Sequence, residues 1–353
     1  MNSRERVRRI INRQSVDRIA IFDSFWSEVR EDFHKQGVPL DIELEEFFDF
    51  DIGMFWFDQS FLLSHETVAE DDEYITFTDE WGTLNKQIKD KQTTPDLIDF
   101  PIKDRSTWET EFKQLLQYSP NRIDWQEMRS RYDALRAKDR YIVLSMLDPF
   151  ESTWHKIGPE FQFIYLIEHP DWMIDMYDTD TRLIEDAWSD MWAKGLQPDA
   201  LWLYGDIAYN HGMMFSPKHY QELLLPFHAR LCELANRHGS QVIYHTDGNI
   251  TKGIPLLIEA GIDCLHPLEV KAGMDVRRLK QDFGDQLAFM GNIDARLFQE
   301  NDKEGLENEI SEKLPVAMQG SGYIFHSDHS IPPGTTLETY RYTLNLVRDL
   351  GNF

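Results

Sequence analysis

The chain has 353 residues, of which 41% are hydrophobic and 13% aromatic, so it can bury a large core as two ordinary domains or as one α/β barrel. Its formal net charge of −26 disfavours anionic partners, namely nucleic acids and acidic membranes. No apolar run approaches the roughly 20 residues that span a bilayer, and no apolar stretch follows the charged N-terminus. We therefore expect a cytoplasmic protein that does not insert into a membrane.

Two further features of the composition narrow the class of protein. The chain has two cysteines, Cys232 and Cys264, too far apart in sequence for a CxxC metal site and too few for a disulfide framework. This usage fits a reducing compartment. The acidic charge either keeps the protein in solution or forms an acidic face for a basic partner or a cationic substrate.

Residues 1–140 are predicted to form an N-terminal extension together with the first strands of the fold. Apolar runs bounded by polar residues indicate strands, and the alternation around Trp81-Gly82 is typical of a hairpin. In chain order we expect a helix at Arg4–Asn12, strands at Arg18–Phe22 and Asp51–Phe57, a hairpin at Tyr74–Lys91 and a charged helical stretch from Pro101 to Lys138.

Residues 141–353 alternate regularly between apolar runs and helical patterns. The predicted strands are Tyr141–Leu147, Ala200–Tyr204, Gln241–Tyr244, Cys264–Leu268, Leu287–Met290 and Gly322–Phe325. The predicted helices are Phe161–Met176, Pro217–Asn236, Ile254–Ala260, Val276–Phe283, Lys303–Leu314 and Leu337–Leu350. With the two early strands the count reaches eight, which predicts a single (β/α)8 TIM barrel with an N-terminal helical and hairpin extension. A doubly wound open sheet is the alternative, but its glycine-rich dinucleotide turn is missing.

Polar side chains follow six of these predicted strands directly. In a parallel barrel these positions open onto one rim, where barrel enzymes keep their active sites. Asp and Asn also occur at strand ends because they cap the helices that follow, so part of this set is expected to serve as caps. The set consists of Asp148, Glu151, Asp206, Tyr209, His245, Asp247, Glu269, Asn292, Asp294, His326, Asp328 and His329.

His245 and Asp247 form the most informative pair in the sequence. They leave the end of an apolar strand at spacing i, i+2, which places both side chains on one face. An imidazole and a carboxylate side by side offer two ligands for a divalent metal, or they form a hydrogen-bonded pair without one. The last predicted strand ends in His326-Ser-Asp-His329, which offers further nitrogen and oxygen donors.

At these residues the chain resembles the uroporphyrinogen decarboxylase-like superfamily, and the resemblance extends over nearly all of residues 1–353. It implies the same single-domain barrel. The similar segments are Arg4–Val7, Val16–Ala20, Asp79–Gly82, Tyr204–Tyr209, Phe215–Pro217, Leu225–Pro226, Tyr244–Gly248, Ala272–Asp275, Phe289–Asp294 and His326–Pro333.

Two branches of the superfamily have different implications. True decarboxylases carry an arginine-rich segment that binds porphyrinogen carboxylates, whereas this chain reads Phe22–Ser27 at that place. The other branch contains zinc methyltransferases, which bind zinc through a His-x-Cys pair and a later Cys. The corresponding positions here are His245, Asp247 and His329, so the spacing is kept while nitrogen and oxygen donors replace sulfur. The aromatic residues Phe22, Phe25, Trp26, Phe55, Trp56 and Phe57 either cover an apolar substrate or belong to the core.

The resemblance implies a metal-dependent methyltransferase that moves a methyl group from a small methoxylated or methylated compound to a corrinoid protein. Zinc is the expected metal, and the partner must supply the corrinoid because the cobalamin-binding signature is missing from the sequence. We assign catalytic roles to Asp206, Tyr209 and Glu269 and substrate binding to Glu151, Asn292 and His326. Asp206 could instead be a fourth metal ligand or cap the strand end, and Glu151 could cap the helix that follows the third strand. Tyr209 could pack under a helix, and His326 competes with His329 as a ligand.

Two other functions stay open at this point. One is a carboxy-lyase related to uroporphyrinogen decarboxylase that acts on a small carboxylated molecule. It needs cations near the substrate, for which Arg296 or Lys271 could serve. The other is a binding protein without catalytic activity on a barrel of enzyme type.

Overall fold

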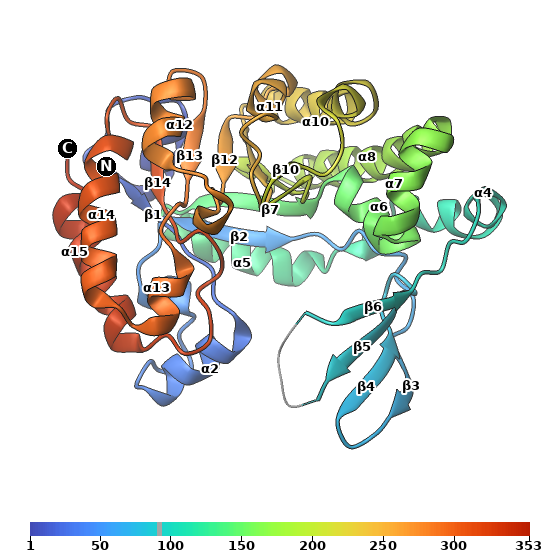
Figure 1. Ribbon diagram of the computed structural model, residues 1–353, viewed down its shortest axis with the longest axis horizontal. Coiled ribbons are helices and arrows are strands. Elements are labelled where there is room, and N and C mark those ends of the chain that lie inside the picture. Colours follow the sequence, from blue (N-terminus) through green and yellow to red (C-terminus); the bar gives the residue numbers. More distant parts are fainter. Residues whose placement is uncertain (90–93) are drawn as a thin grey trace.

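Eight parallel strands curve into a barrel, with helices between them on its outside (Figure 1). The computed structural model describes residues 1–89 and 94–353. The strands follow the order β1-β14-β13-β12-β11-β8-β7-β2 around the sheet, which confirms the predicted (β/α)8 barrel. Their bounds are β1 Ala20–Ile21, β2 Ile52–Trp56, β7 Tyr141–Leu147, β8 Ala200–Tyr204, β11 Gln241–His245, β12 Cys264–His266, β13 Ala288–Met290 and β14 Tyr323–Phe325.

The barrel strands were predictable because they are covered on both faces. In β7 the first six residues are buried, and in β8 only Tyr204 at the end is partly exposed. A strand with helices on one side and a packed interior on the other reads as a continuous apolar run. All eight predicted strands are confirmed, each with its boundary shifted by at most a few residues.

Helices cover the barrel and connect its strands. Their bounds are α1 Ser3–Ile11, α2 Ser27–Lys35, α3 Leu44–Phe47, α4 Arg105–Thr107, α5 Trp125–Ala137, α6 Pro149–Ile157, α7 Pro159–Glu168, α8 Pro170–Ala193, α9 Pro217–His219, α10 Leu225–Arg237, α11 Ile254–Ala260, α12 Val276–Phe283, α13 Ala295–Glu300, α14 Lys303–Ala317 and α15 Leu337–Leu350. Within the described ranges, no helix combines the length and the apolar character needed to cross a bilayer.

Proline accounts for two departures from the predicted helices. The helix expected over Phe161–Met176 is wrong as one unit, because α7 ends at Glu168 and α8 begins at Pro170, whose ring excludes a helical conformation at the residue before it. The helix expected over Pro217–Asn236 is present, with a π-helical turn at Tyr220–Leu224 between α9 and α10. Pro226 follows that turn and lacks the N–H that a regular helix would use.

A small antiparallel sheet projects from the barrel after β2, at the lower right of Figure 1. Its strands are β3 Glu66–Glu70, β4 Tyr74–Thr78, β5 Leu84–Ile88 and β6 Asp96–Asp99. The predicted hairpin over Tyr74–Lys91 is confirmed as β4 and β5, while positions 90 and 91 lie outside the described residues. The outer strands were missed because β3 is exposed along its whole length and so carries no apolar pattern.

The charged stretch from Pro101 to Lys138 is also less regular than predicted. It contains α4, two short helical turns over 108–116, a third turn at Pro120–Arg122 and then α5. Asp124 caps α5 by accepting hydrogen bonds from the backbone N–H groups of Gln126 and Glu127. The predicted helix is therefore confirmed for α5. Between Pro101 and α5 the chain forms short turns instead of one continuous helix.

The barrel has a seam between β1 and β2, which stand at the two ends of the strand order. Asp51, directly before β2, joins them: its N–H donates to the Ile21 carbonyl over 2.9 Å, and its Oδ2 accepts from the Ile21 N–H over 2.8 Å. The fully buried carboxylate also accepts from Arg6 at 2.9 Å and from Arg18 at 2.8 and 3.0 Å. The backbone N–H and the carboxylate of this one residue thus take the place of a strand ladder across the seam.

We expect Asp51→Ala to lower the free energy of unfolding by about 3–5 kcal/mol, because it leaves two guanidinium groups facing an empty acceptor position. Asp51→Asn keeps an acceptor for the Ile21 N–H and should cost less. Urea denaturation of both variants measures the difference. Asp41→Ala, at an exposed position, is the matched control and should stay close to wild type. Equal stability of Asp51→Ala and wild type would show that the seam does not depend on this carboxylate.

Candidate metal centre

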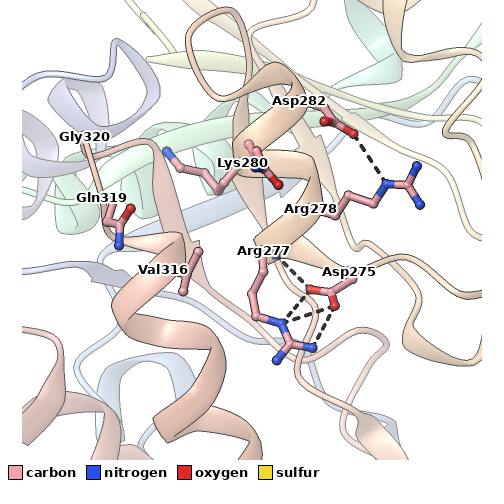
Figure 2. Close-up of a pocket in the computed structure, with 9 residues that line it drawn as sticks. Asp275, Arg277, Arg278, Lys280, Asp282, Val316, Gln319 and Gly320 are labelled. Atoms are coloured by element: carbon pink, nitrogen blue, oxygen red, sulfur yellow. Dashed lines mark hydrogen bonds and ion pairs between the residues drawn. The ribbon is translucent and has the colours of Figure 1, made fainter.

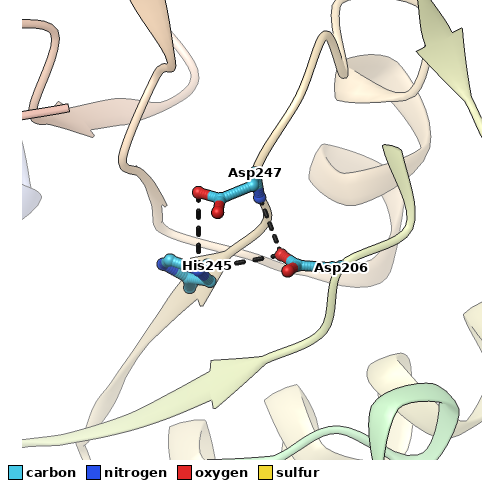
Figure 3. A group of neighbouring side chains, drawn as sticks. All are labelled: Asp206, His245 and Asp247. Atoms are coloured by element: carbon cyan, nitrogen blue, oxygen red, sulfur yellow. Dashed lines mark hydrogen bonds and ion pairs between the residues drawn. The ribbon is translucent and has the colours of Figure 1, made fainter. Parts of the chain in front are cut away.

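Three predicted site residues meet at the rim of the barrel, on the adjacent strand ends of β8 and β11. The register of this parallel pair sets His245 beside Tyr204, so Asp206 and Asp247 lie two residues beyond the paired positions on each strand. His245 Nε2 is 3.7 Å from Asp206 Oδ1 and 3.7 Å from Asp247 Oδ1 (Figure 3). One ligand atom from each of the three residues lies within 4.8 Å of the others. The Asp247 N–H donates to Asp206 Oδ1 over 2.8 Å, which fixes the two loops together.

The chemistry of these three side chains fits a divalent cation. Asp247 Oδ1 is buried and has no hydrogen-bond partner in the described part of the chain, although a buried carboxylate oxygen needs one. Burial raises the pKa of both Asp206 and Asp247, and for Asp206 the neighbouring Asp247 adds to the effect. Burial also lowers the pKa of His245 to about 4, so its imidazole is neutral. A cation would bind a neutral nitrogen and two carboxylates that repel one another in its absence.

Glu151 adds a further carboxyl group to this centre. It lies in the first turn of α6, where Asp148 is the N-cap and accepts from the Glu151 N–H over 2.7 Å. The Glu151 side chain is therefore free of the capping role and turns to the barrel mouth, where Oε2 accepts from the Asp206 N–H over 3.3 Å. Burial, followed by the charges of Asp206 and Asp148, raises the pKa of Glu151 to about 8. Glu151 thus holds a proton at neutral pH.

Glu269 and Tyr209 flank the three-residue group. Glu269 accepts from the Gly248 N–H over 2.8 Å and pairs with Lys271 over 2.7 Å, so it orders the loop after β11. Tyr209 lies on a short strand, β9 Ala208–Tyr209, which pairs with β10 Gly212–Met213. Its side chain is half exposed at the rim. Both residues remain candidates for contact with a substrate.

The other predicted site residues lie outside the three-residue group. His329, predicted as the third ligand, is not one of the three residues that lie together, and its ring stacks on Trp26 with centroids 6.0 Å apart. Its charge still lowers the pKa of both His245 and Asp247, so its role as a ligand stays a prediction. Asn292 is fully buried; its amide donates to the carbonyls of Leu268 and Met274 and accepts from the Val276 N–H. His326 is also buried, at 1% exposure. The amide of Asn292 is thus used by the backbone around it, whereas His326 Nε2 has no partner in the described part of the chain, so a substrate contact of His326 stays a prediction.

The sequence analysis missed His266, the last residue of β12. The parallel register of β11 and β12 pairs His245 with His266, and their Nδ1 atoms are 2.7 Å apart. The signal was present, since His266 ends an apolar run one strand after His245. The following Pro267 and Glu269 drew attention to the loop instead of the strand end.

Aromatic rings surround the centre on one side. Tyr204 stacks on His245 with centroids 4.4 Å apart, and Trp56, which is 55% exposed, lies 4.9 Å from Tyr204. Of the six aromatic residues considered from the sequence, Phe22, Phe25, Phe55 and Phe57 are buried in the core. Trp56 and Trp26 are left to face an apolar ligand.

A hollow of about 850 Å³ lies away from this centre, against α12 and the end of α14 (Figure 2). Its charged residues pair with one another: Arg277 contacts Asp275 and Glu312, and Arg278 contacts Asp282. The Lys280 ammonium donates to the Ser321 carbonyl. The charged side chains of this hollow are therefore engaged with one another, unlike Asp247 Oδ1 at the barrel rim.

The fold of this protein is a (β/α)8 barrel, and nitrogen and oxygen donors lie at the carboxyl ends of its strands. Residues 200–350 match the family model of uroporphyrinogen decarboxylase (URO-D), which confirms over that range the resemblance predicted from the sequence. No curated protein is significantly similar in sequence.

Two solved structures that are similar to this chain differ in how much of it they match. A methyltransferase from Methanosarcina mazei has a TM-score of 0.71 and 15% sequence identity, and the match covers 99% of each chain. A family 2 AP endonuclease from Brucella melitensis has a TM-score of 0.38 and 12% identity, covering 64% of this chain and 84% of that chain. The first comparison supports the same fold over the whole length.

The raised pKa of Glu151 makes stability depend on pH in the metal-free protein. Between its ordinary value of 4.5 and about 8 the folded chain keeps a proton that the unfolded chain has lost. This stabilisation is complete below the lower value and is lost as pH rises through the upper one. We expect the free energy of unfolding of wild type to fall more steeply than that of Glu151→Gln between about pH 5 and about pH 8, and to run parallel to it above that range.

Urea denaturation across this pH range measures the two slopes. Glu160→Gln, at an exposed position of α7, is the control and should keep the wild-type slope. Equal slopes in wild type and Glu151→Gln would mean that Glu151 is ionised at neutral pH.

Proposed function

We propose that this protein is a metal-dependent methyltransferase that moves a methyl group from a small methoxylated or methylated compound to a corrinoid protein. The observation that carries the proposal is the group formed by Asp206, His245 and Asp247 at the barrel mouth, with the unpartnered Oδ1 of Asp247. The fold shared with the Methanosarcina mazei methyltransferase and the match to the uroporphyrinogen decarboxylase family support it.

The donor set favours an oxygen substrate. Carboxylate and imidazole donors leave a bound zinc ion harder and more electrophilic than thiolate donors would. When bound, zinc would supply Lewis acidity that polarises the oxygen of a methoxy group. The three donors come from two paired strand ends, so the protein holds them in place before substrate arrives.

Glu151 supplies the proton that the reaction needs. A reduced corrinoid of the partner would supply the nucleophile that takes the methyl carbon, and the C–O electron pair would then stay on the oxygen. That oxygen must then take up a proton. Glu151 is a buried carboxyl group whose pKa burial raises, and its Oε2 accepts from the Asp206 N–H, so it is the group placed to give this proton. We therefore assign Glu151 the role of general acid.

The side chains at the rim also influence which substrates and partners can bind there. The exposed Trp56 and the ring of Tyr204 give the mouth an apolar side suited to an uncharged organic group. The partner protein has to bring its corrinoid to the same opening.

The carboxy-lyase alternative receives less support. It needs cations that bind substrate carboxylates, but Lys271 pairs with Glu269 and Arg296 pairs with Asp294. The carboxylates at the rim would repel an anionic substrate. The residues that replace the arginine-rich segment of true decarboxylases are largely apolar or acidic.

Elemental analysis of protein purified without chelators is expected to find about one zinc ion per chain. Asp206→Ala, His245→Ala and Asp247→Ala should each lower zinc affinity by more than about 100-fold, because each removes a donor atom, and chelator competition measures this. Asp282→Ala, in the remote hollow, is the control and should keep wild-type affinity. A wild-type protein that binds no transition metal would refute the proposal.

Methyl transfer itself can be followed with a methoxylated donor and a reduced corrinoid protein, from the change in the corrinoid absorption spectrum. We expect Glu151→Gln to lower the rate by about 10²–10⁴-fold while zinc affinity is retained, since it removes the proton and leaves the three donors. Release of carbon dioxide from a carboxylated compound, without methyl transfer, would favour the lyase.

A further inference from the structure

Helix α7 presents an apolar face to solvent. Phe161, Ile164 and Ile167 are 46%, 39% and 70% exposed, and the half-buried Tyr165 stacks on Phe161 with ring centroids 5.8 Å apart. These four side chains share one side of the helix and form what we call the α7 face. Single exposed apolar residues are ordinary, but a contiguous group on a helix of ten residues is typical of an interaction site.

The opposite side of α7 packs against the protein. The Phe163 ring contacts the rings of Phe150 and Trp154 on α6, in both cases with centroids 6.1 Å apart. The Gln162 amide donates to the Phe150 carbonyl over 2.9 Å, and Leu166 is buried. Packing within the barrel therefore explains one side of α7 and leaves the apolar character of the α7 face unexplained.

The α7 face lies on the mouth side of the barrel. α6 starts where β7 ends, and its first turn carries Glu151. From α7 the chain returns through α8 to the start of β8, and the 24 residues of α8 span about 36 Å. β7, with seven residues, spans only about 23 Å. α6 and α7 thus stand beside the rim (Figure 1), and a molecule that docks on α7 has the opening next to it.

The charges around this face indicate which kind of molecule fits it. Glu160 and Glu168 lie on the same side of α7, eight residues apart, which is about 12 Å along the helix. Neither forms an ion pair within the described part of the chain, and α7 contains no lysine or arginine. A second copy would bring the same carboxylates against these two, so like charges would meet. A partner whose apolar surface is flanked by two cations is complementary.

The size of the α7 face suits a transient contact. A helix of ten residues offers a strip about 15 Å long and about 10 Å wide. A stable protein–protein interface buries about 800 Å² on each partner, which is far more than this strip provides. A protein that carries a methyl group away must bind and leave in every turnover, so a small interface is compatible with that task.

We propose that the corrinoid protein of the proposed function docks on the α7 face through an apolar surface flanked by lysine or arginine residues. Docking there brings the partner beside the barrel mouth. The inference rests on the proposed function and adds to it the surface that receives the partner and the chemistry of the partner's matching surface.

Two methyl acceptors separate docking from chemistry. Free reduced cobalamin can reach the mouth by diffusion, whereas the corrinoid protein has to dock. Ile164→Glu and Ile167→Glu each place a charge on the apolar face. We expect each to raise the KM for the corrinoid protein at least about 10-fold and to leave the rate with free cobalamin at the wild-type value.

Leu350→Glu is the matched control for these two variants. Leu350 is 41% exposed at the end of α15, and the neighbouring Gly351 carbonyl accepts from the Ile19 N–H directly before β1, away from the mouth. It should behave as wild type with both acceptors. A wild-type KM for the corrinoid protein in both α7 variants would overturn the proposal.

The dependence on salt tests the charges. We expect the KM of wild type for the corrinoid protein to rise with sodium chloride, because salt screens the attraction between the partners. The double variant Glu160→Gln/Glu168→Gln should have a higher KM at low salt and a weaker dependence on salt. Glu304→Gln/Glu312→Gln, with the same spacing on α14, is the control and should follow wild type. An unchanged KM and salt dependence in the α7 double variant would contradict the proposed complementarity.

Sedimentation velocity of the protein alone examines a second copy as the occupant. We expect a monomer. A dimer that Ile164→Glu dissociates would assign the α7 face to self-association and refute docking of the corrinoid protein there.

The two proposals fail in distinguishable ways. If wild type transfers no methyl group to either acceptor, the proposed function fails and the docking proposal fails with it. If wild type transfers the methyl group to both acceptors and the α7 variants keep the wild-type KM, docking on α7 fails alone. Should Ile164→Glu not fold, Glu160→Gln/Glu168→Gln decides, since both of its positions are exposed.

Discussion

The parallel pairing of β8 with β11 aligns Tyr204 with His245, and the arrangement of the site depends on this register. The backbone continues the alignment past the strand ends, since the Gly205 N–H donates to the His245 carbonyl and the Thr246 N–H donates to the His266 carbonyl. Asp206 and Asp247 therefore leave the barrel wall at the same height. A shift by one residue would turn every side chain to the opposite face and separate the donors.

The carboxylates at this rim form two groups with different surroundings. Asp148 is fully buried and accepts from the Glu151 N–H, His228 and the Tyr244 hydroxyl. A Cβ at position 205 would lie 2.1 Å from its Oδ2, so only glycine lets this carboxylate settle against the neighbouring strand. Asp206, Asp247 and Glu151 have fewer donors around them, and burial raises the pKa of each. Asp148 stabilises the surrounding loops, and the other three carboxyl groups are the ones that we propose for a cation and a proton.

The residues that were predictable from the sequence all lie in a buried strand or within two residues of its end. Strands such as β7 and β8 are apolar on both faces, and Asp206, His245 and Asp247 each follow such a run within two residues. His329 lies four residues beyond β14, in a loop where its ring stacks on Trp26, so the strand pattern of the sequence does not determine its distance from the group. Asn292 looked like a site residue, but its contacts with Leu268 and Met274 come from the fold around it. His266 ends an apolar run as His245 does, but only the register of β11 with β12 sets the two rings side by side.

Asp51 has a consequence for the order in which this barrel assembles. β1 pairs with β14, so the ring of hydrogen-bonded strands closes only after residue 325 has been synthesised. Asp51, Arg6, Arg18 and Ile21 are all made within the first sixth of the chain. Their mutual contacts have short sequence separation and therefore a low cost in loop closure. The N-terminal end can thus hold its two strands side by side as a template while the ribosome still carries the remaining strands.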